Sequence, residues 1–178
     1  MRMLDKLLQG VEVRSLVGDG TVAVGRLEFD SRKVVPGTLF FATRGTQADG
    51  HAYIPAAVAA GAAAVVCEEL PAERPAGVTF VQVPDSTVAL GQVASAFYGH
   101  PSRRLKLVGV TGTNGKTTTA TLLYRMFRRL GYKAGLISTV VYCVDDREIP
   151  STHTTPDSIR LNAMMAEMVE AGCDYCFM

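Results

Sequence analysis

The residues with the clearest chemical potential form one short run, T-G-T-N-G-K-T-T-T, from Thr111 to Thr119. Glycine accepts backbone conformations that turn successive N–H groups toward an anion, and it leaves no Cβ in the way. The lysine after the second glycine can reach the outer phosphates of a nucleotide, and the next threonine hydroxyl can coordinate Mg²⁺. We therefore predict a phosphate-binding loop made of Gly112, Thr113, Asn114, Gly115, Lys116, Thr117 and Thr118.

This run departs from the commonest phosphate-loop pattern, G-x-x-x-x-G-K-[ST], at its first glycine. Val110 stands at that position, and Gly112 gives a shorter G-x-x-G-K-T pattern instead. The alternative is a glycine-rich turn before an ordinary helix. An apolar stretch before the loop and an amphipathic one behind it favour nucleotide binding, although the pattern alone does not say how the nucleotide is used.

The loop needs a strand on one side and a helix on the other. Leu105–Val110 is apolar apart from Lys106, which suits a buried parallel strand. Lys116–Leu130 has apolar residues at helical spacing and ends at Gly131, so its first N–H groups would face a bound anion. With Lys133–Val141 as a returning strand, the segment forms a β-loop-α-β unit.

A further helix and strand follow in this block. Thr155 and Pro156 have the residue types of an N-cap and a first helical position. The helix would end at Gly172 and bury Leu161, Met164, Met165 and Met168. A strand over Tyr175–Met178 comes next, and because a sheet strand is seldom a last element, we expect the polypeptide to continue beyond it.

The earlier part of the chain also mixes strand-like and helical segments. The strand-like ones are Thr21–Phe29, Thr38–Thr43, Ala63–Cys67 and Val78–Val83. The helical ones are Leu4–Leu8, His51–Ala60 and a segment capped by Ser86 that carries Leu90, Val93, Ala94 and Phe97. A turn-rich boundary near Gly99–Ser102 predicts an α/β protein in two parts: a small N-terminal α/β domain, residues 1–100, and the first part of a P-loop parallel-sheet domain, residues 101–178.

Charge and apolar patterning exclude several classes of protein. The formal net charge is only +1, which argues against a nucleic-acid partner. No apolar run approaches the roughly 20 residues of a membrane helix, and the first ten residues do not have the pattern of a secretory signal. Four cysteines in 178 residues are too few for a disulfide scaffold, so we expect a reducing cytoplasm.

Cysteine and histidine spacing offers little further chemistry. Cys173-x-x-Cys176 invites a redox or zinc interpretation. In a strand, however, side chains three residues apart point to opposite faces, and no second pair completes a zinc site. His51, His100 and His153 show no metal or nucleophile spacing.

The loop closely resembles the ATP loop of the Mur ligases, which add amino acids to UDP-N-acetylmuramoyl peptides. Earlier segments resemble the N-terminal domain of the third and fourth ligases of that pathway: Asp30-Ser31-Arg32, Pro36–Ala42, Gly45, Asp49-Gly50-His51 and Ile54. His153–Asp157 is similar to a substrate-contacting segment of the third, MurE-type, ligase. The matches extend from about Asp30 to the end of the chain.

This resemblance implies an ATP-dependent ligase of peptidoglycan synthesis, with ATP and Mg²⁺ as cofactors and small-molecule substrates. The D-glutamate carboxylate of UDP-N-acetylmuramoyl-L-alanyl-D-glutamate would be phosphorylated, and the amine of diaminopimelate or lysine would displace the phosphate. Lys116 and Thr117 would contribute to catalysis, with Thr117 beside the magnesium. Substrate contacts would come from Ser31, Thr46, Gln47, Ala48, Thr154 and Thr155.

Each substrate contact also has a plain structural interpretation. Ser31 can be a turn hydroxyl between Asp30 and Arg32, which can form a surface ion pair of little energetic value. Residues 46–48 can form a loop without a ligand, and Thr155 can serve only as a helix cap.

Alternative functions within the same resemblance are a MurF-type or a folylpolyglutamate-synthase-like ligase, and outside it a short nucleotide-sensing module. The family's later magnesium ligand and its amino-acid-binding domain have no counterpart here, so we expect no ligation by this chain alone. We also expect the full-length protein to be a monomer.

Overall fold

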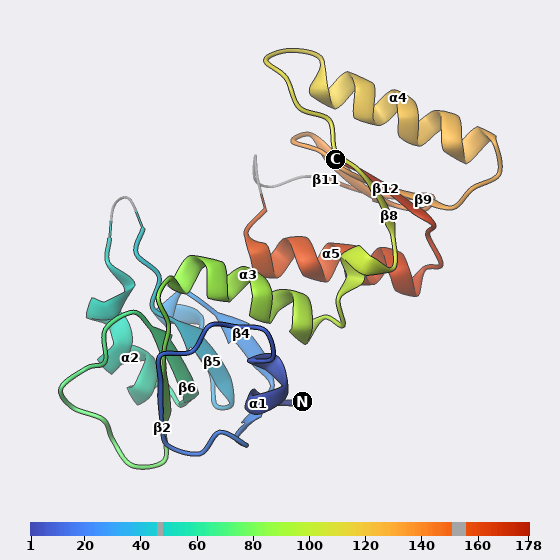
Figure 1. The fold of residues 1–178 in the computed structure, drawn as a ribbon. Coiled ribbons are helices and arrows are strands. Elements are labelled where there is room, and N and C mark those ends of the chain that lie inside the picture. The colour runs from blue at the N-terminus through green and yellow to red at the C-terminus, as the bar shows by residue number, and fades with distance from the viewer. Residues whose placement is uncertain (46–47, 151–155) are drawn as a thin grey trace. The chain divides into compact units, whose positions relative to one another are not determined.

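The computed structural model describes residues 1–45, 48–150 and 156–178, and in it the chain forms two compact units. The first unit is Met1–Phe97 and the second is Tyr98–Met178. The sequence placed a domain boundary between residues 100 and 101, close to this division. Each unit is an α/β layer structure with its own sheet (Figure 1).

The first unit is built on a five-stranded sheet in which four neighbouring strands are parallel. The strands lie in the order β2 (Ser15–Val17), β7 (Thr79–Gln82), β6 (Ala62–Cys67), β5 (Thr38–Phe41) and β4 (Arg26–Glu28). Only β2 is antiparallel, against β7. The carboxyl ends of β4 to β7 therefore meet along one edge of the sheet.

The predicted strand Thr21–Phe29 is wrong as a single element. It contains β3 (Ala23–Val24), which pairs with β1 (Arg2–Met3) in a separate two-stranded sheet, and then β4. Gly25 separates them, and its N–H donates to the Gly37 carbonyl at 2.9 Å rather than to a strand partner. Apolar residues lie close to Gly25 on both sides, at Val24 and Leu27, so composition alone hides the change of partner.

Helices cover both faces of the first sheet (Figure 1). The α2 helix (Ile54–Ala59), preceded by a 3₁₀ turn η2 (Gly50–Tyr53), packs Ile54 and Ala57 against Phe40, Val65 and Phe80. The α3 helix (Ser86–Phe97) contacts β6 and the short α1 (Leu4–Leu7). A second 3₁₀ turn, η1 (Ser31–Lys33), follows β4.

The predicted N-cap of α3 is corrected by one residue. The Asp85 carboxylate accepts the N–H groups of Thr87 and Val88, both at 2.8 Å, which is the bonding of an N-cap. Ser86 lies inside the helix, and its hydroxyl donates instead to the Glu68 carboxylate at 2.8 Å.

The second unit has a mixed five-stranded sheet, in the order β11 (Arg147–Pro150), β10 (Val141–Val144), β9 (Ala134–Ile137), β12 (Tyr175–Phe177) and β8 (Lys106–Val108). The strands β8, β12 and β9 are parallel, and β9, β10 and β11 form an antiparallel meander. The apolar run ending at Val110 was predicted to be buried, but β8 is an edge strand here and Leu107 is 42% exposed.

The predicted strand Lys133–Val141 is also wrong as one element, because the chain reverses between Ser138 and Val141. The Ser138 backbone N–H and hydroxyl both donate to the Val141 carbonyl, at 3.1 and 2.7 Å. This side-chain bond stabilises a tight turn between β9 and β10. The turn places Thr139 beside the N-terminal end of α4.

Two long helices cover opposite faces of the second sheet (Figure 1). On the face of α4 (Lys116–Arg129), Leu136, Cys143 and Phe177 pack around Ala120 and Tyr124. On the face of α5 (Ser158–Glu170), the sheet residues are Ile137, Tyr142, Val144 and Cys176. The prediction that Met164, Met165 and Met168 belong to the core is confirmed, since all three are buried in this second cluster.

The α5 helix begins two residues later than expected. Asp157, not Thr155, has the N-cap role, because its carboxylate accepts the Arg160 N–H at 2.8 Å. Pro156 precedes this cap, and Thr155 lies outside the described residues. Within the described part of the chain, no helix has the length and apolar character needed to cross a membrane.

Candidate nucleotide and substrate sites

The predicted phosphate loop connects β8 to the N-terminus of α4. Gly115 is the N-cap of the helix, with φ of 80°, and Gly112 has φ of 148°. A Cβ at Gly115 would meet open space, so the requirement for glycine there comes from the left-handed backbone rather than from crowding. The sequence interpretation of these two glycines as conformational residues fits this geometry.

Lys116 is the first residue of α4, and its side chain folds back over the loop. Its ammonium group donates to the Gly112 carbonyl and, at 3.4 Å, to the Thr113 carbonyl. Both contacts are to neutral backbone oxygens. Phosphate oxygens are stronger acceptors for an ammonium donor, so an incoming anion can replace these contacts.

Thr117 points from the same helix turn toward the β9–β10 turn. Its hydroxyl oxygen lies 3.4 Å from that of Thr139. The sequence interpretation missed Thr139 because it placed the residue in the middle of a strand. The available signal was the polar pair Ser138-Thr139 inside the apolar stretch from Ala134 to Val144.

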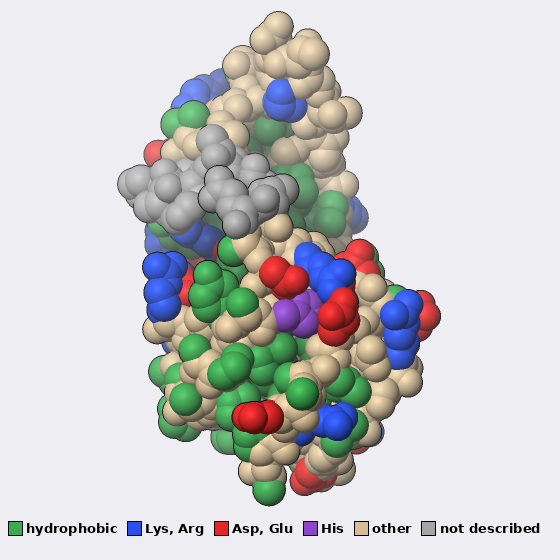
Figure 2. Space-filling model, turned by 90° about the vertical axis from the view of Figure 1, so that its left-hand side faces the viewer, with side chains coloured by type: hydrophobic (Ala, Val, Ile, Leu, Met, Phe, Trp, Pro, Cys, Tyr) green, Lys and Arg blue, Asp and Glu red, His purple; other side chains and the backbone are tan. Residues whose placement is uncertain are grey.

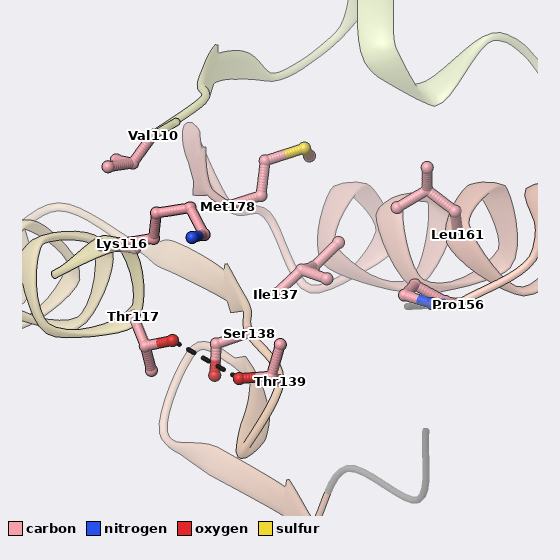
Figure 3. Close-up of a pocket in the computed structure, with 10 residues that line it drawn as sticks. Val110, Lys116, Thr117, Ile137, Ser138, Thr139, Pro156, Leu161 and Met178 are labelled. Carbon is pink, nitrogen blue, oxygen red and sulfur yellow. Dashed lines mark hydrogen bonds between the residues drawn. The ribbon is translucent and has the colours of Figure 1, made fainter. Parts of the chain in front are cut away.

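These groups line a pocket of about 250 Å³ in the second unit. Figure 3 shows Lys116 and Thr117 on one side and Ser138 and Thr139 across from them, with Ile137 nearby. The remaining wall is largely apolar and consists of Val110, Ala120, Pro156, Leu161 and Met178. An ammonium and hydroxyl groups beside apolar walls suit a phosphate transfer from which water is kept away. The two threonine hydroxyls are oxygen donors of the kind Mg²⁺ prefers.

Two predicted substrate residues of the first unit, Ser31 and Ala48, lie at the carboxyl edge of its sheet. Ser31 follows β4 and Ala48 follows β5, and these parallel strands are neighbours, with Glu28 paired to Phe40. In open α/β sheets, ligands bind outside this edge. Of the other predicted contacts, Thr46, Gln47, Thr154 and Thr155 lie outside the described residues.

Ser31 stands in a turn organised by its neighbours. The Asp30 carboxylate accepts the Arg32 backbone N–H at 3.1 Å and two bonds from the Arg32 guanidinium, each at 2.9 Å. The expected Asp30–Arg32 ion pair is therefore present, and the hydrogen bonds from Arg32 lower the pKa of Asp30 to about 2. Among the described residues, the Ser31 hydroxyl forms no hydrogen bond, and the residue is half-buried.

The two cysteines of Cys173-x-x-Cys176 lie in one apolar cluster, contrary to the expectation of opposite faces. The reason is that β12 begins at Tyr175, so strand alternation does not apply to Cys173. Both thiols are free, and burial raises the pKa of Cys176 to about 12. Among the described residues, no group of three or more His, Cys, Asp or Glu side chains is arranged to hold a metal ion.

The fold and the pocket together define a nucleotide-binding α/β protein with a phosphate loop. Residues 110–178 match the Mur ligase middle domain, and residues 24–98 match the Mur ligase family catalytic domain. The chain belongs to the Mur ligase family.

Individual relatives refine this assignment. The chain is 53% identical over 176 residues to the UDP-N-acetylmuramoyl-L-alanyl-D-glutamate–2,6-diaminopimelate ligase of Bacteroides thetaiotaomicron, covering 99% of this chain and 36% of the relative. A solved structure of a ligase with the same name gives a TM-score of 0.76 at 22% identity, over 99% of this chain and 35% of that one. The chain thus spans about a third of the length of the relatives it matches.

A MurF ligase offers a more distant comparison. The enzyme of Thermotoga maritima, solved in complex with ADP, gives a TM-score of 0.50 at 31% identity, over 64% of this chain and 25% of that one. The MurE-type relative is matched over nearly the whole chain and at higher identity, which favours the MurE type.

Proposed function

We propose that this chain provides the ATP-binding and UDP-substrate-binding parts of a MurE-type ligase. The reaction joins 2,6-diaminopimelate to UDP-N-acetylmuramoyl-L-alanyl-D-glutamate at the expense of ATP. The observation that carries the proposal is the pocket lined by Lys116, Thr117 and Thr139, in which the two threonine hydroxyls lie 3.4 Å apart beside a largely apolar wall. The proposed substrates are those in the name of the Bacteroides relative.

The chemistry requires an activated carboxylate, because a carboxylate itself is a poor electrophile. An oxygen of the D-glutamate carboxylate attacks the γ-phosphorus of ATP, and ADP leaves with the electrons of the broken P–O bond. The amine then attacks the acyl carbon, phosphate leaves, and the nitrogen loses a proton. Negative charge on the transferred phosphoryl group is the main quantity that the protein must stabilise.

Lys116 supplies a positive charge at the loop, from which its ammonium group can move onto the γ-phosphate. Backbone N–H groups of Gly112–Thr118 and the N-terminus of α4 bind the β-phosphate. Mg²⁺ would neutralise phosphate charge, and the Thr117 hydroxyl would hold it from this chain. The apolar walls, including Ile137 and Leu161, limit the access of water to the acyl phosphate.

The substrate contacts stay proposals of the same kind. Ser31 and Ala48 would meet the uridine part, with Thr46 and Gln47 beside Ala48, while Thr154 and Thr155 would meet the sugar-peptide part. Ser31 and Ala48 follow neighbouring strands at the sheet edge where a ligand is expected, which supports the first pair. We further propose a cytoplasmic enzyme that acts as a monomer.

Nucleotide binding by the chain tests this proposal. Isothermal titration should show one site for ATP, whose affinity increases when Mg²⁺ is added, and a separate site for UDP-N-acetylmuramoyl-L-alanyl-D-glutamate. ATP should not compete with the UDP-sugar peptide. A chain that binds neither nucleotide, or that binds both at one site, would contradict the assignment.

A further inference from the structure

A network of charged and polar side chains lies at the carboxyl edge of the first sheet, outside the pocket described above. Its members are Arg44, Asp49, His51, Glu68 and Glu69, from the segments that follow β5 and β6. On the face drawn in Figure 2, acidic and basic side chains gather around a histidine. The sequence interpretation gave His51 no role.

The hydrogen bonds of His51 define its protonation. Its Nε2 accepts the backbone N–H groups of Glu68 and Glu69, at 2.9 and 3.3 Å. A backbone N–H can only donate, so Nε2 carries no proton, and Nδ1 must donate to the Asp49 carboxylate 2.6 Å away. The ring is therefore the neutral Nδ1–H tautomer, with both nitrogens in use and only 15% of the side chain exposed.

These bonds connect the segment that follows β5 with the segment that follows β6. Asp49 belongs to the loop that leaves β5, while the two amides begin the segment after β6. Arg44, at the opposite end of the same loop, reaches the same region: its guanidinium lies 3.3 Å from Glu68, 3.7 Å from Asp49, and also pairs with Glu69. Arg44 and Asp49 are thus both connected to the segment after β6, Arg44 directly and Asp49 through His51.

The backbone of the loop is closed independently of these side chains. Gly50 donates to the Thr43 carbonyl at 2.9 Å, and Gly45 donates to the Ala48 carbonyl at 3.0 Å. A Cβ on Gly50 would lie 2.6 Å from the Thr43 oxygen, so this position requires glycine. These backbone bonds do not reach the segment after β6, so His51 and Arg44 supply the contacts that hold Asp49 and Arg44 against it.

Glu68 extends the network to the start of α3. Its carboxylate accepts the Ser86 N–H at 3.0 Å and the Ser86 hydroxyl at 2.8 Å. The segments after β5, β6 and β7 are consequently linked through one set of hydrogen bonds. A loop held in this way loses little conformational entropy when a ligand binds beside it.

We propose that His51 is a positioning residue of the uridine-nucleotide site: the neutral imidazole joins Asp49 to the Glu68–Glu69 segment and so fixes the neighbouring Ala48 for the nucleotide. The proposal rests on the proposed function of this sheet edge. His51 has no free ring nitrogen to exchange protons with a substrate, and it belongs to a different unit from Lys116. Its effect is on nucleotide affinity and not on phosphate transfer.

Three substitutions separate the two halves of the imidazole bridge. His51→Gln keeps an acceptor near the Nε2 position, His51→Asn keeps a donor near the Nδ1 position, and His51→Phe keeps ring volume without either. Binding of UDP is measured by isothermal titration on the 178-residue chain, well below the melting temperature of each variant. Binding of ATP to the same samples is the control, because its loop lies in the second unit.

We expect the Phe and Asn variants to bind UDP about tenfold more weakly, because two amides lose their acceptor and the loop loses its anchor. The Gln variant should stay within about threefold of the unchanged chain, and ATP affinity should be the same in all of them. A Phe variant that binds UDP as the unchanged chain does would overturn the proposal. If that variant does not fold, equal UDP affinities of the Gln and Asn variants would overturn it.

An unchanged chain that binds ATP but not UDP would remove the proposed nucleotide site, and this inference with it. If the unchanged chain does bind UDP, a loss of UDP affinity in the Phe and Asn variants with ATP affinity unchanged supports the His51 bridge. The two failures are therefore distinguishable in one set of titrations.

Discussion

At the scale of single residues, the protein places a few side chains whose charges and hydrogen bonds are tuned by their immediate neighbours. Lys116 is held by carbonyl oxygens that a phosphate can replace, and Thr117 faces Thr139. The sequence alone predicted Lys116 and Thr117 as site residues, because a lysine and a threonine directly after a glycine-rich loop form a recognisable phosphate-binding pattern. It could not predict Thr139, whose position depends on a turn.

Replacing Lys116 by methionine should weaken ATP binding by about tenfold to one hundredfold, since a charge-assisted hydrogen bond contributes about 1.5–3 kcal/mol. Arg125→Met removes a cation of similar length from the exposed side of the same helix and should change the affinity by less than about twofold. Isothermal titration with ATP and Mg²⁺ measures both. Equal losses in the two variants would show that general electrostatics, not the loop lysine, holds the nucleotide.

Carboxyl groups of the first unit should make its stability depend on pH. Hydrogen bonds lower the pKa of Asp30 to about 2, and backbone and side-chain hydrogen bonds also lower the pKa values of Asp49 and Glu68. A carboxyl with a lowered pKa stabilises the folded state above its unfolded pKa, near 4, and this contribution is lost as the pH falls toward 2.

Asp30→Asn keeps the N-cap but removes the charge, so it isolates one of these groups. The variant should be less stable than the unchanged protein at pH 7, by less than about 1 kcal/mol because Arg32 is exposed. The difference should vanish near pH 2. Urea unfolding at several pH values gives the comparison, and a constant difference across this range would rule out the ion pair as its cause.

At the scale of elements, apolar periodicity predicts helices well and strand ends poorly in this protein. The helix after the loop was predicted as Lys116–Leu130 and is Lys116–Arg129. The prediction of one strand over residues 133–141 was wrong because apolar residues resume directly after a turn that the Ser138 side chain stabilises. Helix starts failed by one or two residues where Asp85 and Asp157 cap in place of their neighbours.

The packing of α5 on the second sheet depends on a glycine. A Cβ added to Gly135 would lie 2.2 Å from the Met168 sulfur and 2.8 Å from its Cγ, and Met168 is fully buried. Gly135→Ala should therefore destabilise the protein by about 1–3 kcal/mol through overpacking. Denaturant unfolding should detect this easily.

Two comparison variants identify the cause. Gly20→Ala meets only ordinary contacts, the closest at 3.7 Å, and should change stability by less than about 0.5 kcal/mol. In a Met168→Ala background, the effect of Gly135→Ala should become smaller, because the clashing side chain is gone. An unchanged penalty in that background would point to the strand backbone instead of the methionine.

At the scale of the whole molecule, two α/β units each present a candidate ligand site of their own. The sequence predicted the α/β class and two parts from motif order and turn composition. It did not predict the order of strands or the hydrogen bonds that join the segments after β5, β6 and β7, because such contacts connect residues far apart in the chain.

All four cysteines are buried, and burial raises the pKa of each thiol, to about 11 for Cys67 and about 12 for Cys176. The native protein should react with an alkylating reagent at pH 8 far more slowly than the unfolded chain, in which four thiols become available. Mass spectrometry after timed labelling counts the modified sites. Rapid native labelling of Cys173 or Cys176 would contradict the packing of the α5 face.

The central claim is that this chain serves as the nucleotide- and substrate-binding part of a MurE-type ligase. The most direct measurement uses the Bacteroides thetaiotaomicron ligase with its matching segment replaced by these 178 residues. Phosphate release is followed with ATP, UDP-N-acetylmuramoyl-L-alanyl-D-glutamate and a panel of amino acids. Release that needs both the UDP-sugar dipeptide and diaminopimelate, and that disappears with Lys116→Met, is the predicted result. A folded chimera that binds ATP but releases no phosphate with this dipeptide and any amino acid would contradict the account.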